Sequence, residues 1–350
     1  MVSSVKNELR LPVEIAVEGV QGLLIAGGMA SNHAQSVAAV LVESDLLGHR
    51  THGLAQLPGY LDRLRDGIIS SAGVVEVERD HGAAFLWRAQ RLPGAWVLHR
   101  AIEQALDRIS SHPVVTISIA DCSHIGALQA YLEALGRRGL LALMMVTSPA
   151  IASVAPFGGR DAVLTSNPIA ACIPTEGDPV LIDQSTSVVS NGALASYSGG
   201  RLPGQWLLDA QGRLSDDPAD AASGTILPLG GEEFGFKGFA LGLIVEAFAL
   251  ALSGHARNVP SVPGSQGVFL QLIDPGKFAG REAFLAGTTD LVQRCKGSRP
   301  VPGRSIRLPG ERALACKSEQ LVQGIVVDKA VVAAIDHWSE QLQTPWRPSA

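Results

Sequence analysis

The sequence predicts an α/β or α+β fold, because helical periodicity and short apolar strands alternate along most of the chain. Residues 93–110 repeat apolar side chains at helical spacing, and an apolar strand follows over 114–120. The same order recurs at once, with a helix over 128–138 and a buried strand over 140–147. A chain of 350 residues is longer than one small core requires, so two domains are expected.

The other elements are predicted from the same periodicities and from their Gly, Ser and Asn boundaries. Before residue 93 we expect helices over 12–29, 32–47 and 57–67, and two short strands within 73–88 that turn at residues 80–82. After residue 147 we expect strands over 180–183, 224–228 and 267–273, an exposed excursion over 201–223, a buried helix over 236–253, a connector over 254–265, and helices over 279–296 and 328–343.

The composition limits the partners and the compartment. Only 17% of the residues are charged, against about 25% in an ordinary soluble chain, and this shortage favours an oligomer with a buried interface. The net charge of −5 gives no general attraction to nucleic acid or to an anionic membrane. Acidic residues interrupt the N-terminal apolar stretch, and the longest apolar run, 239–252, is too short to span a bilayer. We therefore expect a soluble, cytoplasmic protein.

Two classes of site are disfavoured by missing motifs. The four cysteines lack metal-like spacing, so we expect no metal site and free thiols in a reducing compartment: Cys122, Cys172, Cys295 and Cys316. The chain also lacks G-x-G-x-x-G and G-x-x-x-x-G-K-[ST]. Any nucleotide must therefore be held by something other than a Rossmann or Walker loop.

The stretch from 48 to 60 carries the clearest chemical signal. Thr51, His52 and Gln56 place a hydroxyl, an imidazole and an amide within six residues, directly after a predicted helix. A hydroxyl beside a histidine can form a proton-transfer pair, and imidazole titrates near neutral pH. Taken alone, the segment is explained equally well as a histidine in a polar turn.

Further polar residues follow predicted strands. His124 comes directly after the strand over 114–120, where free helix N–H groups can receive a phosphate, although the ring can equally satisfy its own loop. Gly158 to Arg160 allow close backbone approach and residues 165–167 carry short polar side chains, but together they are also typical of a turn between two strands.

Two charged residues stand at predicted element ends. Asp183 ends a buried strand and precedes three hydroxyl residues, so its carboxylate can orient an imidazole. The local sequence favours the alternative, an ordinary helix cap. Lys237 begins a helix, where a cation is electrostatically misplaced, and this indicates a nearby anion such as a cofactor phosphate.

Seven motifs in this order resemble those of the malate/L-lactate dehydrogenase family that lacks a Rossmann fold: HGLAQLPGY, SHIGAL, APFGGR…TSNPIA, DQSTS, GQWLLDAQG, PLGG…KGFALGL and RLPGE. The resemblance spans about residues 12–340. The family includes ureidoglycolate and sulfolactate dehydrogenases, diketogulonate reductase, and reductases of Δ1-piperideine-2-carboxylate and Δ1-pyrroline-2-carboxylate.

The resemblance implies a fold, an assembly and a reaction. A mixed or antiparallel sheet domain, residues 73–265, would bind NAD(P), and a helical domain for dimerisation and the substrate side would combine residues 1–72 with 266–350. The chain would form a homodimer with active sites near the interface. Its reaction would be hydride transfer between nicotinamide and an α-keto or α-imino carboxylate.

The resemblance also implies residue roles. His52 would be the proton donor, with Thr51 beside it and Asp183 as the acid that completes the relay, while Gln56 and Thr165 would face the substrate. The residues of the cofactor-contacting regions would be His124, Ile125, Gly126, Ala127, Leu128, Ser166, Asn167, Pro168, Gln184, Ser185, Thr186, Ser187, Lys237, Gly238, Pro309, Gly310 and Glu311.

The chain departs from the family pattern around its histidine motif. Most members carry an arginine at the position of Gln56, and that arginine pairs with the substrate carboxylate; a neutral amide cannot form this bidentate pair. Members also commonly have an arginine where this chain has Leu47 and an acid where it has Arg50. Arg50 and Arg160 are therefore the candidate substitutes for carboxylate binding.

The predicted function is NAD(P)H-dependent reduction of a small cyclic α-imino acid, Δ1-pyrroline-2-carboxylate or Δ1-piperideine-2-carboxylate, to L-proline or L-pipecolate. The resemblance favours NADPH over NADH. One alternative is a dehydrogenase of a linear 2-hydroxy acid of the lactate, malate, sulfolactate or ureidoglycolate type. A second alternative, from another class, is a cofactor-binding protein that has lost catalysis, because Gln56 replaces a residue that most members use.

Overall fold

A mixed sheet of seven strands forms the centre of the molecule. The structure, a computed structural model, describes residues 8–347. The strands lie in the order β2 (Glu76–Asp80), β3 (Ala84–Arg88), β4 (Val114–Cys122), β11 (Gln266–Ile273), β5 (Leu141–Thr147), β6 (Ile169–Ile173) and β7 (Val180–Gln184). Only β3 and β4 run parallel, and every other neighbouring pair is antiparallel. The predicted α/β class with a mixed, mainly antiparallel sheet is confirmed.

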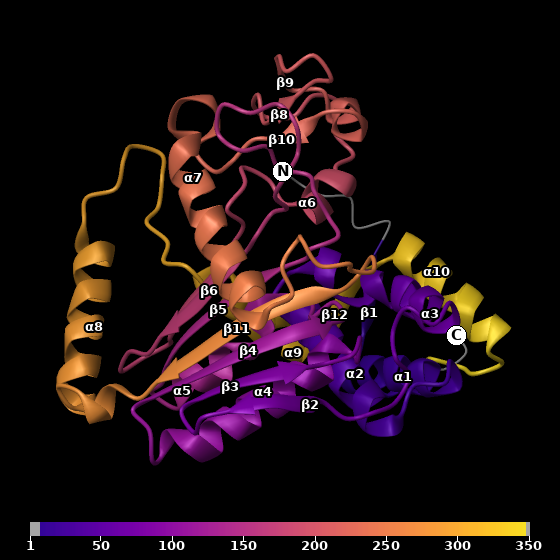
Figure 1. The fold of residues 1–350 in the computed structure, drawn as a ribbon, viewed down its shortest axis with the longest axis horizontal. Helices are drawn as coiled ribbons and strands as arrows, with labels where there is room; N and C mark the ends of the chain where they lie inside the picture. The colour runs from indigo at the N-terminus through magenta and orange to yellow at the C-terminus, as the bar shows by residue number, and fades with distance from the viewer. Residues whose placement is uncertain (1–7, 348–350) are drawn as a thin grey trace.

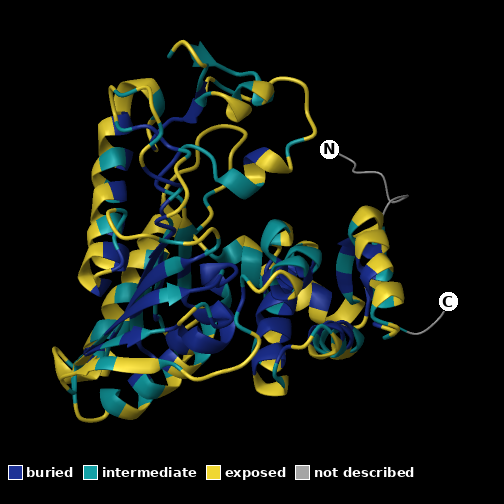
Figure 2. Cartoon of the chain, turned by 45° about the vertical axis from the view of Figure 1, so that its right-hand side comes forward, coloured by how far each residue is buried: buried dark blue, intermediate teal, exposed yellow. Residues whose placement is uncertain are grey.

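Helices cover the sheet and extend it on one side (Figure 1). The helix α4 (Gly94–Ile109) buries Leu98, Ala101 and Ala105 and packs against β4 and β11, while its other side meets α2 (Ser31–Leu46). In turn, α2 packs against α1 (Val13–Ala26). Apolar residues of these helices and of the sheet form one core, which Figure 2 shows as the dark blue interior.

The first and last strands of the described chain pair in the helical part. β1 (Glu8–Leu11) pairs antiparallel with β12 (Ile325–Asp328), and α10 (Lys329–Gln341) packs against α3 (Leu57–Arg65). The helical part therefore combines N-terminal and C-terminal segments of the described chain, as expected. Neither β1 nor β12 was predicted, because their pairing joins residues far apart in the sequence.

The predicted domain boundary at residue 266 cuts through the sheet. Strand β11 begins at that residue and lies between β4 and β5, with seven paired residues on each side. Residues 266–273 therefore belong to the sheet and must be moved out of the helical group. The division of the chain into two domains itself remains a prediction.

A smaller lobe stands above the sheet in Figure 1. It holds the three-stranded sheet of β10 (Thr225–Ile226), β8 (Leu207–Leu208) and β9 (Leu214–Ser215), and the short helix α6 (Asn191–Ala195). A separate apolar cluster supports it: Val154, Leu164, Leu194, Leu202, Leu207 and Ile226. The segment 201–223 was expected to be a plain exposed excursion, but it supplies two strands and part of this cluster.

The long apolar helix is not buried, contrary to the prediction. α7 (Gly231–Val245) continues through a π-helical turn (Glu246–Leu250) and a 3-10 turn (Ala251–Ser253). The whole helix, 23 residues, is long and apolar enough to span a bilayer by length and composition alone. The prediction that this apolar segment, taken as 239–252, is too short to do so is therefore wrong. Only 33% of its most apolar window is buried. Its exposed large side chains are Phe234, Phe236, Leu243, Ile244, Phe248 and Leu252.

Helices of the C-terminal region surround a groove beside the edge strand β7. α8 (Arg281–Gly297) has no buried residue and stands at the edge of the molecule in Figure 1. α9 (Glu311–Gln323), which the sequence did not predict, buries only Gln320 and packs against α2. Between them and the short helix α5 (Glu133–Arg137) lies a groove of about 580 Å³.

Candidate active site

The Thr51–His52 segment is a tight loop between two helices. α2 ends at Leu46, and Gly48 follows with φ +83°, a left-handed conformation that favours glycine. The chain then forms two single 3-10 turns, η2 (Arg50–His52) and η3 (Leu54–Gln56), before α3 begins. The loop is therefore fixed at both ends by helices of the main core.

A buried carboxyl group supports this loop from below. The Leu54 N–H donates to Asp45 Oδ2 at 2.8 Å, and Asp45 itself is buried on α2. Gly53 lies directly against this carboxyl, since a Cβ at that position would be 2.1 Å from Asp45 Cγ. Burial raises the pKa of Asp45 to about 7, against the opposing effect of the Leu54 N–H. The sequence reasoning did not identify Asp45.

His52 and Thr51 form the expected pair. Thr51 Oγ1 lies 3.0 Å from His52 Nδ1, and the side-chain amide of Gln56 donates to the Thr51 carbonyl at 2.7 Å. His52 is half-buried, and burial, with a smaller contribution from His49, lowers the pKa of His52 below its usual range. A protonated His52 is therefore a stronger acid than a free imidazole. The side chain of Gln56 is therefore hydrogen-bonded to the backbone of the loop, a contact that its residue type alone did not predict.

A second imidazole faces His52. The His124 ring lies 5.8 Å from the His52 ring, centroid to centroid, and the Tyr60 hydroxyl contacts His124 at both Nδ1 (3.0 Å) and the carbonyl (2.9 Å). Burial lowers the pKa of His124 to about 3, with smaller contributions from His52 and Arg63. His124 is therefore neutral near pH 7, and the two rings lie close together without repelling each other as cations.

The structure does not form the expected relay from Asp183 to His52. Within residues 8–347, no hydrogen bond joins Asp183 to either member of the Thr51–His52 pair. Its carboxylate instead accepts the backbone N–H groups of Gln129 and Leu128 at the start of the 3-10 turn η4 (Leu128–Tyr131). This turn lies more than fifty residues before Asp183, so the contact is neither the relay nor the local helix cap that the sequence favoured. Burial raises the pKa of Asp183, and nearby His49 opposes this shift.

His49 is the histidine that this acid faces. His49 Nε2 lies 2.7 Å from Gln129 Oε1, and Gln129 Nε2 donates to the Leu181 carbonyl at 3.1 Å. Because the Gln129 amide nitrogen is used on Leu181, its oxygen must accept the N–H of His49. His49 and Gln129 had not been singled out in the sequence, and only their positions beside the motif residues pointed to them.

Neither arginine expected to replace the family's arginine reaches His52. Arg50 turns away from the loop and pairs with Glu8 at 2.9 Å and Asp328 at 3.5 Å, across the β1–β12 ribbon. Arg160 is exposed in the upper lobe and lies 3.5 Å from Asp161. The structure therefore does not support a substrate contact by Arg50, which is held in ion pairs, or by Arg160, which lies in the upper lobe.

The first turn of α6 brings the upper lobe to the histidine. A Cβ on Gly192 would lie 3.8 Å from atoms of both Thr51 and His52, so this glycine packs against the pair at ordinary contact distance. Next to it, the Asn191 amide donates to the Thr165 hydroxyl at 3.0 Å. Thr165 is thus linked through Asn191 to the helix that packs against His52, and its role toward a substrate remains a prediction. Asn191 and Gly192 were missed because no motif marked them.

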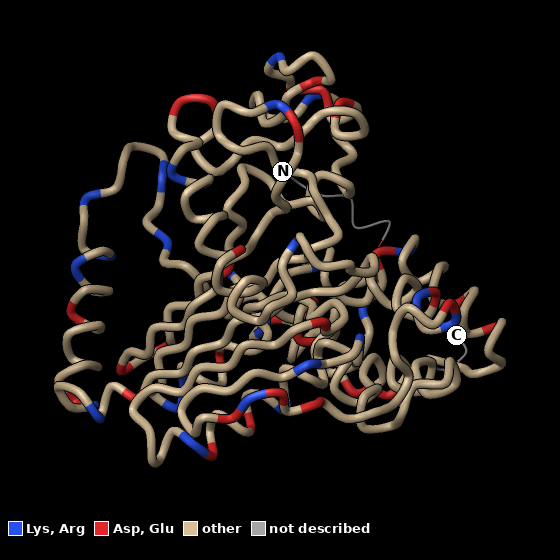
Figure 3. The backbone as a smooth tube through the Cα atoms, viewed as in Figure 1, with Lys and Arg blue, Asp and Glu red and all other residues tan. Residues whose placement is uncertain are grey.

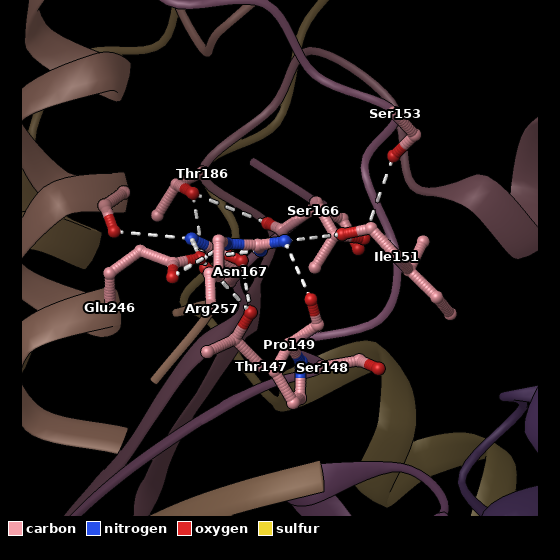
Figure 4. A network of polar contacts seen from close by, with 12 residues as sticks. Thr147, Ser148, Pro149, Ile151, Ser153, Ser166, Asn167, Thr186, Glu246 and Arg257 are labelled. Atoms are coloured by element: carbon pink, nitrogen blue, oxygen red, sulfur yellow. Dashed lines mark hydrogen bonds and ion pairs between the residues drawn. The ribbon is translucent and has the colours of Figure 1, made fainter. Parts of the chain in front are cut away.

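Asn167 belongs to a polar network rather than to an open binding surface (Figure 4). Its side chain accepts from Thr147 Oγ1 at 2.6 Å and donates to Glu246 Oε1 at 2.8 Å, and its φ of +39° is left-handed. Arg257 closes the network with two bonds to Glu246, at 2.8 and 2.9 Å, and a third to the Ile151 carbonyl at 2.7 Å. These contacts fix the junction of sheet, α7 and loop.

The hydroxyl groups after Asp183 also bond within the chain. Ser185 donates to the Ser187 carbonyl at 2.9 Å, Thr186 to the Asn167 carbonyl at 3.1 Å, and Ser187 to the Val189 carbonyl at 2.7 Å. Their hydrogens therefore stabilise the turn, and only their oxygen lone pairs remain for a ligand. Pro168 and Ser166 likewise give backbone carbonyls to neighbouring strands and turns.

The remaining expected contact residues fall into three places. The segment after His124 is mostly buried: Ile125 N–H donates to Gln266 Oε1 at 3.0 Å, and Gly126 adopts φ +82° against Val40. Lys237 is exposed on α7, 4.9 Å from the Phe234 ring, and Gly238 packs on Leu229. The third place is the groove beside β7, which the expected contacts Pro309 and Glu311 line.

Helix α9 lies between that groove and the start of the histidine loop. The Pro309 carbonyl accepts the Leu181 N–H at 3.2 Å, two residues before Asp183. On α9, Lys317 pairs with Glu43 and Glu133. The neighbouring Cys316 does not line the groove, and its Sγ lies 3.4 Å from where Gly48 would carry a Cβ. In the portion of the chain described, no three His, Cys, Asp or Glu side chains are grouped to hold a metal ion.

Comparisons with known proteins match most of the chain. The family model for malate/L-lactate dehydrogenase matches residues 12–336. A malate/(S)-sulfolactate dehydrogenase of Methanothermus fervidus is 30% identical over 91% of this chain and 94% of its own. A Δ1-pyrroline-2-carboxylate/Δ1-piperideine-2-carboxylate reductase of Pseudomonas syringae pv. tomato is 31% identical over 88% of this chain and 90% of its own.

A solved structure gives the same result. The crystal structure of Δ1-piperideine-2-carboxylate reductase from Pseudomonas syringae pv. tomato superposes with a TM-score of 0.84 at 27% identity, over 94% of this chain and 99% of that one. With this fold and with the family model matching nearly its full length, the chain belongs to the malate/L-lactate dehydrogenase family and is an NAD(P)-dependent oxidoreductase.

Proposed function

We propose that the enzyme reduces a small cyclic α-imino acid, Δ1-pyrroline-2-carboxylate or Δ1-piperideine-2-carboxylate, to L-proline or L-pipecolate, with NADPH as the hydride source. The observation that carries this proposal is the setting of His52. Its partners are the hydroxyl of Thr51, the neutral ring of His124 and the small Gly192. The groups in direct contact with the proton donor are therefore uncharged.

The uncharged setting favours a substrate with a single anionic group. Malate and sulfolactate carry a second anion that would need its own cation, and both Arg50 and Arg160 are directed elsewhere. A cyclic imino acid has one carboxylate and a compact apolar ring. The similarity to a reductase named for these two imines supports the same choice.

The proposed proton transfer follows from the Thr51–His52 contact. In the protonated ring, Nδ1–H donates to the Thr51 hydroxyl, so Nε2–H is the proton left for the substrate. When bound, NADPH supplies a hydride to the imine carbon and is oxidised to NADP⁺. The electron pair of the C=N bond moves to the ring nitrogen, which takes the proton from His52. The lowered pKa of His52 makes this transfer easier.

The groove beside β7 is the proposed place for the nucleotide part of the cofactor. Its volume of about 580 Å³ lies within the range of ~300–1,000 Å³ typical of ligand sites. Leu308, Pro309, Glu311 and Lys317 are among its lining residues, and the last two lie on the same helix, α9. The mixture of charged and apolar groups fits a nucleotide, and α9, which lines part of the groove, packs with Cys316 against Gly48 at the start of the loop.

We further propose a cytoplasmic homodimer in which the exposed apolar side of α7 meets the partner subunit. Six large apolar side chains on one helix are too many to leave in water, and only a third of the helix's apolar window is buried within the chain. Light scattering should give twice the chain mass of 36.6 kDa. Phe248→Glu should shift the protein toward the monomer, whereas a monomeric wild type would contradict the proposal.

The test is a substrate panel read by loss of NADPH absorbance. Δ1-pyrroline-2-carboxylate and Δ1-piperideine-2-carboxylate are compared with pyruvate and oxaloacetate, each with NADPH and NADH, using wild type and His52→Gln. Preferential turnover of the imines with NADPH, reduced ~10²–10⁴-fold in the variant, would support the proposal. Preferential turnover of keto acids would assign a linear 2-hydroxy acid dehydrogenase, which the similarity to a malate/(S)-sulfolactate dehydrogenase favours. Cofactor binding without any turnover would indicate an inactive relative.

A further inference from the structure

The helix that follows the histidine loop presents one cation on the side that carries Gln56. Gln56 precedes α3, and Tyr60 and Arg63 follow at four and seven residues, spacings that place all three on one side of a helix. Tyr60 contacts His124, which stacks on His52. This side of α3 is therefore continuous with the site.

The Arg63 side chain reaches back toward the start of the helix. Its guanidinium lies 5.9 Å from the Tyr60 ring centroid, and Nη2 lies 3.8 Å from where a Cβ would stand on Gly59. Long helical side chains lean toward the N-terminus, where the Thr51–His52 loop lies. Because Gly59 has no side chain, position 59, one turn before Arg63, leaves room for the guanidinium.

Arg63 also has no anionic partner within residues 8–347. Its neighbour Arg65 is held by Asp62 and Asp66, both at 3.0 Å, and Arg50 is held by Glu8 and Asp328. Arg63 makes only the contact with the Tyr60 ring, and its side chain is half-buried. A half-buried guanidinium without a carboxylate has its full set of donors available for a ligand.

We propose that Arg63 binds the carboxylate of the substrate and so takes over the task of the arginine that other family members carry at position 56. The inference rests on the proposed function, in that it requires a substrate with a carboxylate beside the reacting carbon. A guanidinium placed over Tyr60 offers two parallel N–H groups to a carboxylate, which fixes both the position and the orientation of a small substrate. His124 supplies no competing charge, because burial keeps it neutral.

Kinetics of four variants test this role. Arg63→Gln should raise the KM for the imino or keto acid about 10- to 100-fold while the KM for NADPH stays unchanged, because only the carboxylate contact is lost. Arg63→Lys should give an intermediate KM, since an ammonium keeps the charge but not the bidentate geometry. Arg65→Gln, on the same helix, is the matched control and should leave both KM values unchanged. Gln56→Arg added to Arg63→Gln should restore the substrate KM to within a few-fold of wild type.

A binding experiment separates this inference from the proposed reaction. Calorimetry with pyrrole-2-carboxylate, a planar ring acid that resembles the imines and carries the same carboxylate, measures the anion site without turnover, with and without NADP⁺. Arg63→Gln should weaken binding at least 10-fold and Arg65→Gln should not. Binding unchanged in Arg63→Gln, or no binding to the wild type, would overturn the inference whatever the activity assay shows. Turnover of no substrate together with Arg63-dependent binding would overturn only the proposed reaction.

Discussion

The carboxyl of Asp45, buried beneath the histidine loop, makes the stability of the enzyme depend on pH. The pKa of Asp45 rises from 3.8 to about 7 in the folded protein because its charged form is buried. The native state therefore binds this proton more tightly than the unfolded chain. The free energy of unfolding should fall as pH rises through this interval and level off above pH 7. Asp45→Asn removes the titration but keeps an oxygen for the Leu54 N–H.

The magnitude follows from the size of the shift. A change of about three pKa units corresponds to about 4 kcal/mol, at about 1.4 kcal/mol per unit. Because Asp45 in the unfolded chain is already ionised at pH 5, the free energy of unfolding of the wild type should fall by about 3 kcal/mol between pH 5 and pH 8. The Asn variant should therefore match the wild type within about 1 kcal/mol at pH 5 and exceed its stability by a few kcal/mol at pH 8.

Urea unfolding of both proteins at pH 5, 6, 7 and 8, at one protein concentration, measures this difference. All other titrating groups contribute equally to the two proteins, so they cancel when the free energies of unfolding are subtracted. A difference that stays constant from pH 5 to pH 8 would refute the reasoning. If the wild type instead gained stability relative to Asp45→Asn as pH rises, the pKa of Asp45 would be lowered by folding, not raised.

Three further predictions concern the site and its support. Thr51→Val should lower kcat about 10-fold with little change in KM, because the His52 ring loses its hydroxyl partner; steady-state kinetics would contradict this if kcat were unchanged. The reductive rate should fall as pH rises through a value below 6.5, because the proton donor has a lowered pKa; a midpoint above 7 in the kcat/KM profile would rule out His52 as that group. Arg257→Met should cost about 2–4 kcal/mol in urea unfolding, because it leaves the half-buried Glu246 without its cation; a loss under 0.5 kcal/mol would show the pair to be dispensable.

The sequence predicted the elements that the local pattern determines. The apolar strands β4, β5 and β11 and the amphipathic helix α4 were found close to their observed bounds because their periodicity reflects burial directly. α9 was missed because it buries only Gln320, and its few apolar side chains, such as Leu314 and Leu321, are scattered among charged and polar residues. α7 was taken as buried because sequence alone does not distinguish a side chain that faces the core from one left exposed.

In the site, too, local sequence patterns did not predict contacts between residues that are far apart in the chain. Thr51 and His52 are adjacent in the chain, so their contact was predictable. The choice of partner for Asp183 depends on a single 3-10 turn that places His49 toward the acid and His52 toward α6. Arg50 was misjudged because its partners come from the two chain ends, whose pairing in the β1–β12 ribbon no local pattern reveals.

The most direct test of the proposed reaction follows the hydride itself. The enzyme is given Δ1-pyrroline-2-carboxylate and NADPH that carries deuterium at both C4 positions, and the product is analysed by mass spectrometry and chiral chromatography. Reduction with a proton from His52 predicts L-proline with one deuterium at C2 and none on nitrogen after exchange in water, formed at a rate that His52→Gln lowers ~10²–10⁴-fold. Product without deuterium, or labelled product formed equally fast by His52→Gln, would contradict the account.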